Sequence, residues 1–100
     1  MKLVITPTAQ HQIDNQAQYG IARHGHRTAQ RTFSRVERFF APTLVEYPRT
    51  GTYIAAKQIY ERLIPRTPFI VIYRLEDTRD TLRVLGFFHH AQNRDEFDAD

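Results

Sequence analysis

Residues 59–75 read Ile59-Tyr-Glu-Arg-Leu-Ile-Pro-Arg-Thr-Pro-Phe-Ile-Val-Ile-Tyr-Arg-Leu75, and after a charged break at 76–80 the chain continues Thr81-Leu-Arg-Val-Leu-Gly-Phe-Phe-His-His90. These are three β-rich runs of strand length, separated by two turn-like breaks. Connections this short cannot make a parallel crossover, so they predict an antiparallel meander. The middle run is apolar or aromatic from Phe69 to Tyr73, which predicts a central strand with both faces at least partly covered.

The turn lengths also predict how the three strands pair. A two-residue loop at Arg66-Thr67 would place Arg62 opposite Val71, and the second break would place Leu75 opposite Thr81 and Tyr73 opposite Arg83. Because side chains alternate along a strand, this register sorts them onto two faces, and a one-residue slip would scatter them. The predicted buried face carries Leu63, Ile70, Ile72, Leu82, Val84 and Phe88, and the opposite face carries Tyr60, Arg62, Val71, Tyr73, Arg83, Leu85 and His89.

Composition limits the classes of protein that the chain can belong to. One hundred residues are enough for one domain with its own core. The absence of cysteine excludes a disulfide framework and a thiolate metal site, and it suits the reducing cytoplasm. The short apolar run before Pro7 predicts neither a signal peptide nor a membrane span. A net charge of +3 favours an acidic partner, either nucleic acid or protein.

The first half of the chain predicts a strand followed by two helices. Leu3, Val4 and Ile5 form a short strand-like run, after which Thr6 can cap a helix that has Pro7 at its first position. Gly25 is expected to end that helix, and Pro42 is expected to kink or stop a second one. The apolar stripe of the first helix is Ala9, Ile13, Ala17 and Ile21, and that of the second is Ala29, Phe33, Val36 and Phe40.

The predicted fold is therefore α+β, with the order β-α-α-β-β-β. Two amphipathic helices joined by a short glycine-containing turn form a hairpin, which would pack on the Leu63, Ile70 and Val84 face of a small, mainly antiparallel sheet. We expect a single domain over residues 1–94, followed by an acidic tail over 95–100. Phe39 lies beside the helix stripe, which predicts that Phe39 and Phe40 do not share one core.

The order of elements and several short motifs resemble the RelE/ParE superfamily of type II toxins. These motifs are Tyr47-Pro-Arg-Thr-Gly51 before the sheet, Ile72-Tyr73-Arg74 in the central strand, and Arg83-Val-Leu85 running into His89-His-Ala-Gln-Asn93. The resemblance covers residues 2–93 and is closer to ParE, the plasmid stabilisation branch. It implies a small cytoplasmic toxin that inhibits DNA gyrase and is neutralised by a cognate antitoxin, through which alone it would reach operator DNA.

The RelE branch supplies an alternative function. RelE-type toxins cut mRNA on the ribosome, and Arg62, Arg83 and His89 match positions that such nucleases place around the scissile phosphate. Arginine can stabilise phosphate charge in the transition state, and histidine can move a proton. These nucleases usually also carry lysines before the second strand of the meander, where this chain has only Lys57. Enzymatic activity is thus not the main expectation; if present, it would be a metal-independent endoribonuclease.

The binding residues follow from the helix hairpin. We expect an antitoxin segment to dock along it at Phe39, Arg35 and Arg38, because basic and apolar groups fit an acidic amphipathic helix. The plainer interpretation is a solvated arginine face, and an adaptor without toxic activity also stays open. No cofactor, metal or membrane partner is expected, since His24, His26, His89 and His90 show no recognised ligand spacing with carboxylates.

Overall fold

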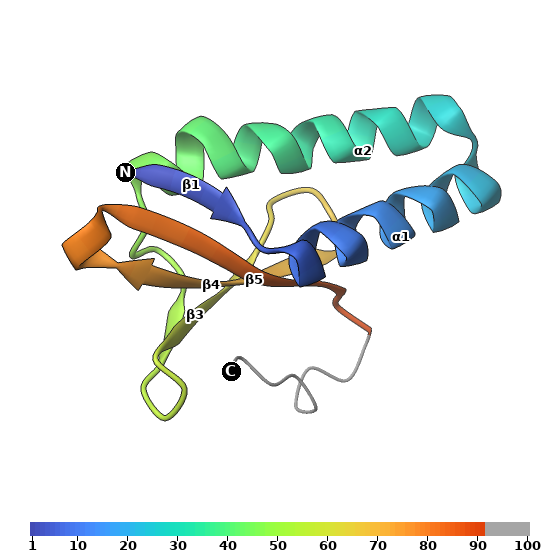
Figure 1. Ribbon diagram of the computed structural model, residues 1–100. Helices are drawn as coiled ribbons and strands as arrows, with labels where there is room; N and C mark the ends of the chain where they lie inside the picture. The colour runs from blue at the N-terminus through green and yellow to red at the C-terminus, as the bar shows by residue number, and fades with distance from the viewer. Residues whose placement is uncertain (92–100) are drawn as a thin grey trace.

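Two helices lie across one face of a five-stranded sheet in the computed structural model, which describes residues 1–91 (Figure 1). The predicted acidic tail over 95–100 and the domain boundary at 94 lie outside these described residues. The elements are β1 (Lys2–Ile5), α1 (Pro7–His24), α2 (His26–Arg38), η1 (Phe39–Leu44), β2 (Thr52–Ile54), β3 (Ile59–Leu63), β4 (Phe69–Glu76), η2 (Asp77–Arg79) and β5 (Thr81–His89).

The helix boundaries follow the signals in the sequence. The Ala9 amide donates a hydrogen bond of 3.2 Å to the Thr6 hydroxyl, which caps α1, and Pro7 occupies its first turn. Gly25 has φ of +87°, a conformation that suits glycine, and it separates α1 from α2. The predicted break at Pro42 is also confirmed, since Ala41 is extended (φ −145°, ψ 120°) within η1.

The break in η1 corrects the prediction for the two adjacent phenylalanines. Phe39 is 6% exposed and Phe40 is 4% exposed, and both belong to the same core cluster. The prediction that they cannot share a core was wrong because it extended a regular helix through this point. The ring of Phe39 instead lies beneath the Arg62 side chain, whose guanidinium carbon is 5.3 Å from the ring centroid.

The sheet has the order β1-β5-β4-β3-β2. Strands β3, β4 and β5 form the predicted antiparallel meander, and β1 pairs with β5 in the parallel sense, with Lys2 opposite Thr81. The short strand β2 was not predicted; it pairs with β3 and places Tyr53 opposite Tyr60. The α+β architecture with a helix hairpin on one face is confirmed.

The register of the meander was predicted correctly on one side only. Arg62 does lie opposite Val71, as the two-residue loop indicated. Between β4 and β5, however, Tyr73 pairs with Val84 rather than with Arg83, and the register shifts again beyond Ile72. The reason is the connection, in which η2 and a left-handed Asp80 (φ +48°) shift the first pair to Glu76 and Thr81. The later shift is a β-bulge, which a length count does not reveal.

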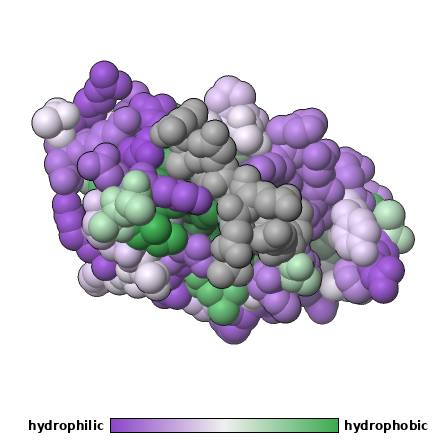
Figure 2. Space-filling model, turned by 90° about the horizontal axis from the view of Figure 1, so that it is seen from below, coloured by the Kyte–Doolittle hydropathy of each residue, from purple (hydrophilic) through white to green (hydrophobic). Residues whose placement is uncertain are grey.

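The different register between β4 and β5 exchanges the two faces of β3 and β4 relative to those of β5. The covered face, which packs against the helices, carries Tyr60, Arg62, Phe69, Val71, Tyr73, Leu82, Val84 and Phe87. The far face carries Glu61, Leu63, Ile70, Ile72, Arg74, Glu76, Arg83 and Phe88. The helices were therefore predicted on the wrong face of β3 and β4, and Leu63 and Phe88 lie on the far face. The burial predicted for Ile70, Ile72, Leu82 and Val84 is confirmed. Figure 2 views the molecule from the far side, where green apolar patches lie among purple polar groups; Leu63 there is 52% exposed.

Candidate functional site

Arg62, the first residue of the nuclease hypothesis, lies on the covered face. Its guanidinium packs over Phe39, and its Nη1 donates a hydrogen bond of 2.9 Å to the Leu63 carbonyl. Its Nε is buried and has no hydrogen-bond partner in the described part of the chain. A buried N–H that donates no hydrogen bond costs stability, and the aromatic contact and the bond to the Leu63 carbonyl together hold this side chain in place.

Arg83 lies on the opposite side of the sheet. Its Nε and Nη2 donate hydrogen bonds of 3.1 and 2.9 Å to the same carboxylate oxygen of Glu76. These hydrogen bonds lower the pKa of Glu76 below its ordinary value and raise that of Arg83. Arg83 is thus already engaged with a carboxylate, and the thickness of the sheet separates it from Arg62.

His89 returns to the covered face after the bulge. Its ring meets the edge of the Phe69 ring, with centroids 5.9 Å apart, while the neighbouring His90 is exposed. His89 also lines an apolar hollow of about 260 Å³ beneath the helix hairpin, together with Tyr19 and His24. The common face predicted for Arg62, Arg83 and His89 is therefore wrong, because the register differs. Their catalytic role stays a prediction, without the shared pocket that was its geometric premise.

The antitoxin residues of the sequence analysis do come together. Arg35, Arg38 and the edge of Phe39 line a hollow of about 170 Å³ with Thr43, Pro65 and Arg66. A second hollow, of about 330 Å³, continues along α2 past Arg27, Gln30, Arg31 and Ser34. We call these two hollows the basic groove. Since Phe39 is almost fully buried, it forms the floor of the groove, and the arginines form its accessible part.

The arginines of the basic groove have few counter-charges. Arg27, Arg31, Arg35 and Arg38 follow one another at helical spacing along α2, where Glu37 is the one acidic residue. The ion pairs within residues 1–91 join other groups: the N-terminus with Asp80, Arg49 with Asp77, and Arg83 with Glu76. A row of uncompensated cations attracts anionic partners and speeds their association.

Sequence reasoning missed the polar framework around Tyr73. The hydroxyl of this fully buried residue donates a hydrogen bond of 2.7 Å to the Pro48 carbonyl, and burial raises its pKa to about 12. A Cβ atom at Gly51 would lie 2.9 Å from both the Tyr73 hydroxyl oxygen and the Glu61 carbonyl oxygen, so only glycine fits without rearrangement. The motif at residues 47–51 gave the signal, since a glycine directly before a strand can mark such a close approach.

The described residues hold neither a candidate metal site nor a candidate membrane-spanning helix. Within residues 1–91, no three histidine, aspartate or glutamate side chains gather as a metal site would require. None of the helices described is both long and apolar enough to cross a membrane. Arg74 donates hydrogen bonds to the backbone carbonyls of Gln58 and Lys57, at 3.2 and 3.0 Å.

A helix hairpin on a five-stranded mixed sheet, with β1 parallel to β5 and a basic groove along α2, defines the class of the chain as a small α+β domain. Comparison with protein families narrows the class: the family described as "ParE toxin of type II toxin-antitoxin system, parDE" matches residues 3–94. The chain belongs to this family.

Comparison with solved structures supports the same fold. The structure titled "Chromosomal ParDE TA system from P. aeruginosa" superposes with a TM-score of 0.73 at 18% sequence identity. The match covers 89% of this chain and 95% of that chain. Among curated proteins, none matches the chain. At this identity the structural likeness establishes the fold, and the family match carries the assignment as a toxin.

Proposed function

We propose that this toxin acts in the cytoplasm by inhibiting DNA gyrase and is neutralised by an antitoxin that occupies the basic groove. The observation that carries the choice of target is the separation of Arg62 and Arg83 by the sheet, together with family membership. Arginines that stabilise the charge of one scissile phosphate must all reach that phosphate. Arg62 and Arg83 lie on opposite faces of the sheet and cannot both reach it, which favours action by protein binding.

The target is tested by producing the toxin with and without its antitoxin. We expect growth arrest without the antitoxin, loss of gyrase supercoiling in the presence of purified toxin, and intact mRNA. The variant Arg83→Ala serves as the control for the nuclease alternative, because its toxicity should equal that of the wild type. The gyrase proposal would be overturned if the wild type cleaved mRNA and left supercoiling normal, and if Arg83→Ala no longer cleaved mRNA. That result would support the endoribonuclease alternative.

The antitoxin site rests on charge and shape. The groove offers cations along one edge of α2 and an aromatic floor at Phe39, which suits an amphipathic helix with acidic residues on one side. Contact with operator DNA would then come through the antitoxin. Association should slow as salt rises, because steering by exposed charges is screened.

The groove is tested by removing two of its charges. The double variant Arg35→Gln/Arg38→Gln should bind the antitoxin more weakly and associate more slowly at low salt, with unchanged thermal stability. The matched control is the double variant Arg23→Gln/Arg79→Gln, which also removes two exposed arginine charges, one near the end of α1 and one in η2, both outside the groove. If both variants lose affinity equally, net charge rather than this groove determines binding, and the site is wrong. Phe39→Ala is unsuitable here because it would empty a core position.

A further inference from the structure

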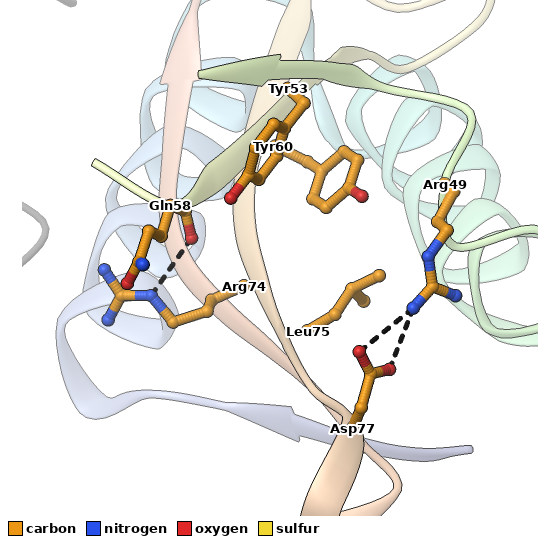
Figure 3. Close-up of a pocket in the computed structure, with 7 residues that line it drawn as sticks. All are labelled: Arg49, Tyr53, Gln58, Tyr60, Arg74, Leu75 and Asp77. Carbon is orange, nitrogen blue, oxygen red and sulfur yellow. Dashed lines mark hydrogen bonds and ion pairs between the residues drawn. The ribbon is translucent and has the colours of Figure 1, made fainter. Parts of the chain in front are cut away.

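A fourth hollow lies at the other end of the sheet, away from the basic groove. It has a volume of about 400 Å³, within the range of small-molecule sites. We call it the tyrosine pocket, and it is lined by Arg49, Tyr53, Gln58, Tyr60, Arg74, Leu75 and Asp77. Figure 3 shows Arg74 and Gln58 on one side, Arg49 and Asp77 on the other, and the two tyrosine rings between them above Leu75.

The aromatic part of the pocket is the open end of a row of rings. Tyr53, Tyr60 and Tyr73 are neighbours across β2, β3 and β4, with ring centroids 4.9 and 5.3 Å apart. Tyr73 is fully buried, Tyr60 is half-buried and Tyr53 is 53% exposed. The exposed end of the row is the Tyr53 ring, which a flat aromatic ligand can cover. The buried end, Tyr73, fixes the position of the row.

The two arginines of the pocket differ in their remaining charge. Arg49 Nη2 donates hydrogen bonds of 2.9 and 3.1 Å to the Asp77 carboxylate, which offsets its charge. Arg74 is held by the neutral carbonyls of Gln58 and Lys57, which orient the guanidinium. It also attracts the Glu76 carboxylate at longer range, but that carboxylate accepts its hydrogen bonds from Arg83. The two bonds to the carbonyls use Nε and Nη2 of Arg74, and a guanidinium has five N–H donors, so Arg74 keeps donors for an anion.

The opposite wall presents different chemistry. The Asp77 carboxylate accepts hydrogen bonds and Arg49 donates them, so this side can bind a polar ring edge that carries both donors and acceptors. An acidic peptide would gain nothing from Asp77. A nucleotide combines all the required features: a flat aromatic base, a polar base edge and an anionic phosphate.

We propose that the tyrosine pocket binds a nucleotide. The base stacks on Tyr53, its polar edge meets Asp77 and Arg49, and the phosphate is bound by Arg74. This site is independent of gyrase and of the antitoxin groove, so neither proposal depends on the other. The nucleotide is either free or part of a single strand, since both present the same base and phosphate.

Nuclear magnetic resonance of the tyrosine rings tests the proposal on the full chain. The chain has five tyrosines, and adenosine 5′-monophosphate should shift the signals of Tyr53 and Tyr60 while Tyr19 and Tyr47 stay unchanged. Tyr53→Ala should weaken binding tenfold or more, equivalent to about 1.4 kcal/mol. The matched control is Tyr19→Ala, because Tyr19 is similarly exposed, at 58%, but lies outside the pocket.

Further probes separate the parts of the ligand. Arg74→Gln should weaken binding of the monophosphate but leave that of uncharged adenosine unchanged. A short single-stranded oligodeoxyadenylate that binds tighter than the monophosphate identifies a strand as the source, and equal affinity identifies a free nucleotide. Two results would overturn the proposal: no ring shifts at millimolar monophosphate, or inorganic phosphate binding as tightly as the nucleotide.

Discussion

The covered face and the far face of the sheet both contain an arginine from the meander, yet the two arginines are held in different ways. Arg62 lies under the helices against an aromatic ring and keeps a buried Nε without a partner. Arg83, across the sheet, forms an ion pair with Glu76 at 2.9 Å. A charged residue in a strand therefore does not mark the solvent side, because a long side chain can cover apolar surface while its head stays polar.

The largest expected effect comes from the centre of the covered face. Tyr73→Ala should lower the free energy of unfolding by about 3–5 kcal/mol, because it empties a fully buried aromatic site. Leu63→Ala, on the far face and half exposed, should cost about 1 kcal/mol. Chemical denaturation of both variants measures the difference. Equal losses would show that the two faces of the sheet contribute alike to stability.

The next effect concerns the turn that packs against Tyr73. Gly51→Ala should destabilise the protein by about 1–3 kcal/mol, since the added Cβ would lie 2.9 Å from two oxygen atoms. Gly20→Ala is the matched control, because its Cβ would meet Ala29 at an ordinary 3.7 Å within a helix. That control should be about 0.5–1 kcal/mol more stable than the wild type. Thermal unfolding of both proteins decides, and a neutral Gly51→Ala would contradict the close approach.

The free energy of unfolding should depend on pH above 10 because of the Tyr73 hydroxyl. Its pKa in the folded protein is raised to about 12 from an ordinary 10.0, mainly by burial. The folded state therefore holds this proton more tightly than the unfolded state does. The associated stability is complete below pH 10 and is lost as pH rises towards 12. Denaturation at several pH values should show this loss in the wild type and a flatter profile in Tyr73→Phe; parallel profiles would refute it.

The smallest effect compares the two arginines directly. Arg62→Ala should cost about 1 kcal/mol through lost packing on Phe39, and Arg62→Met should recover most of it, because it restores the stem and removes the partnerless Nε. Arg83→Ala should cost less than Arg62→Ala. The three variants are compared by urea denaturation. A greater loss in Arg83→Ala would mean that the far face, rather than the covered face, depends on its arginine.

The sequence predicted local features better than the relation between distant ones. The cap at Thr6, the break at Gly25 and the pairing of Arg62 with Val71 each depend on a few neighbouring residues, and each is confirmed. The pairing of β4 with β5 depends on the conformation of Asp80 and on a bulge, neither of which has a distinct pattern in this sequence. Because β4 is apolar on both faces, its composition could not correct the slip.

The candidate sites divide in the same way. Arg35, Arg38 and Phe39 are close in sequence on one helix and its continuation, so their common hollow could be predicted. The tyrosine pocket joins residues 49 to 77, and its row of rings depends on the unpredicted strand β2. Neither hydrophobic periodicity nor spacing could bring these residues together, because two separate strand pairings, β2 with β3 and β3 with β4, determine their positions.

The parallel pairing of β1 with β5 has a consequence for folding during translation. A ribosome makes Lys2–Ile5 before the partner of this strand, residues 81–84, which lies more than 70 residues further along the chain. Until those residues emerge, the first strand has no neighbour in the sheet, and contacts between such distant segments form slowly. The nascent chain therefore completes its sheet only after residues 81–84 have emerged, so that synthesis of the first strand and its incorporation into the sheet are separate events.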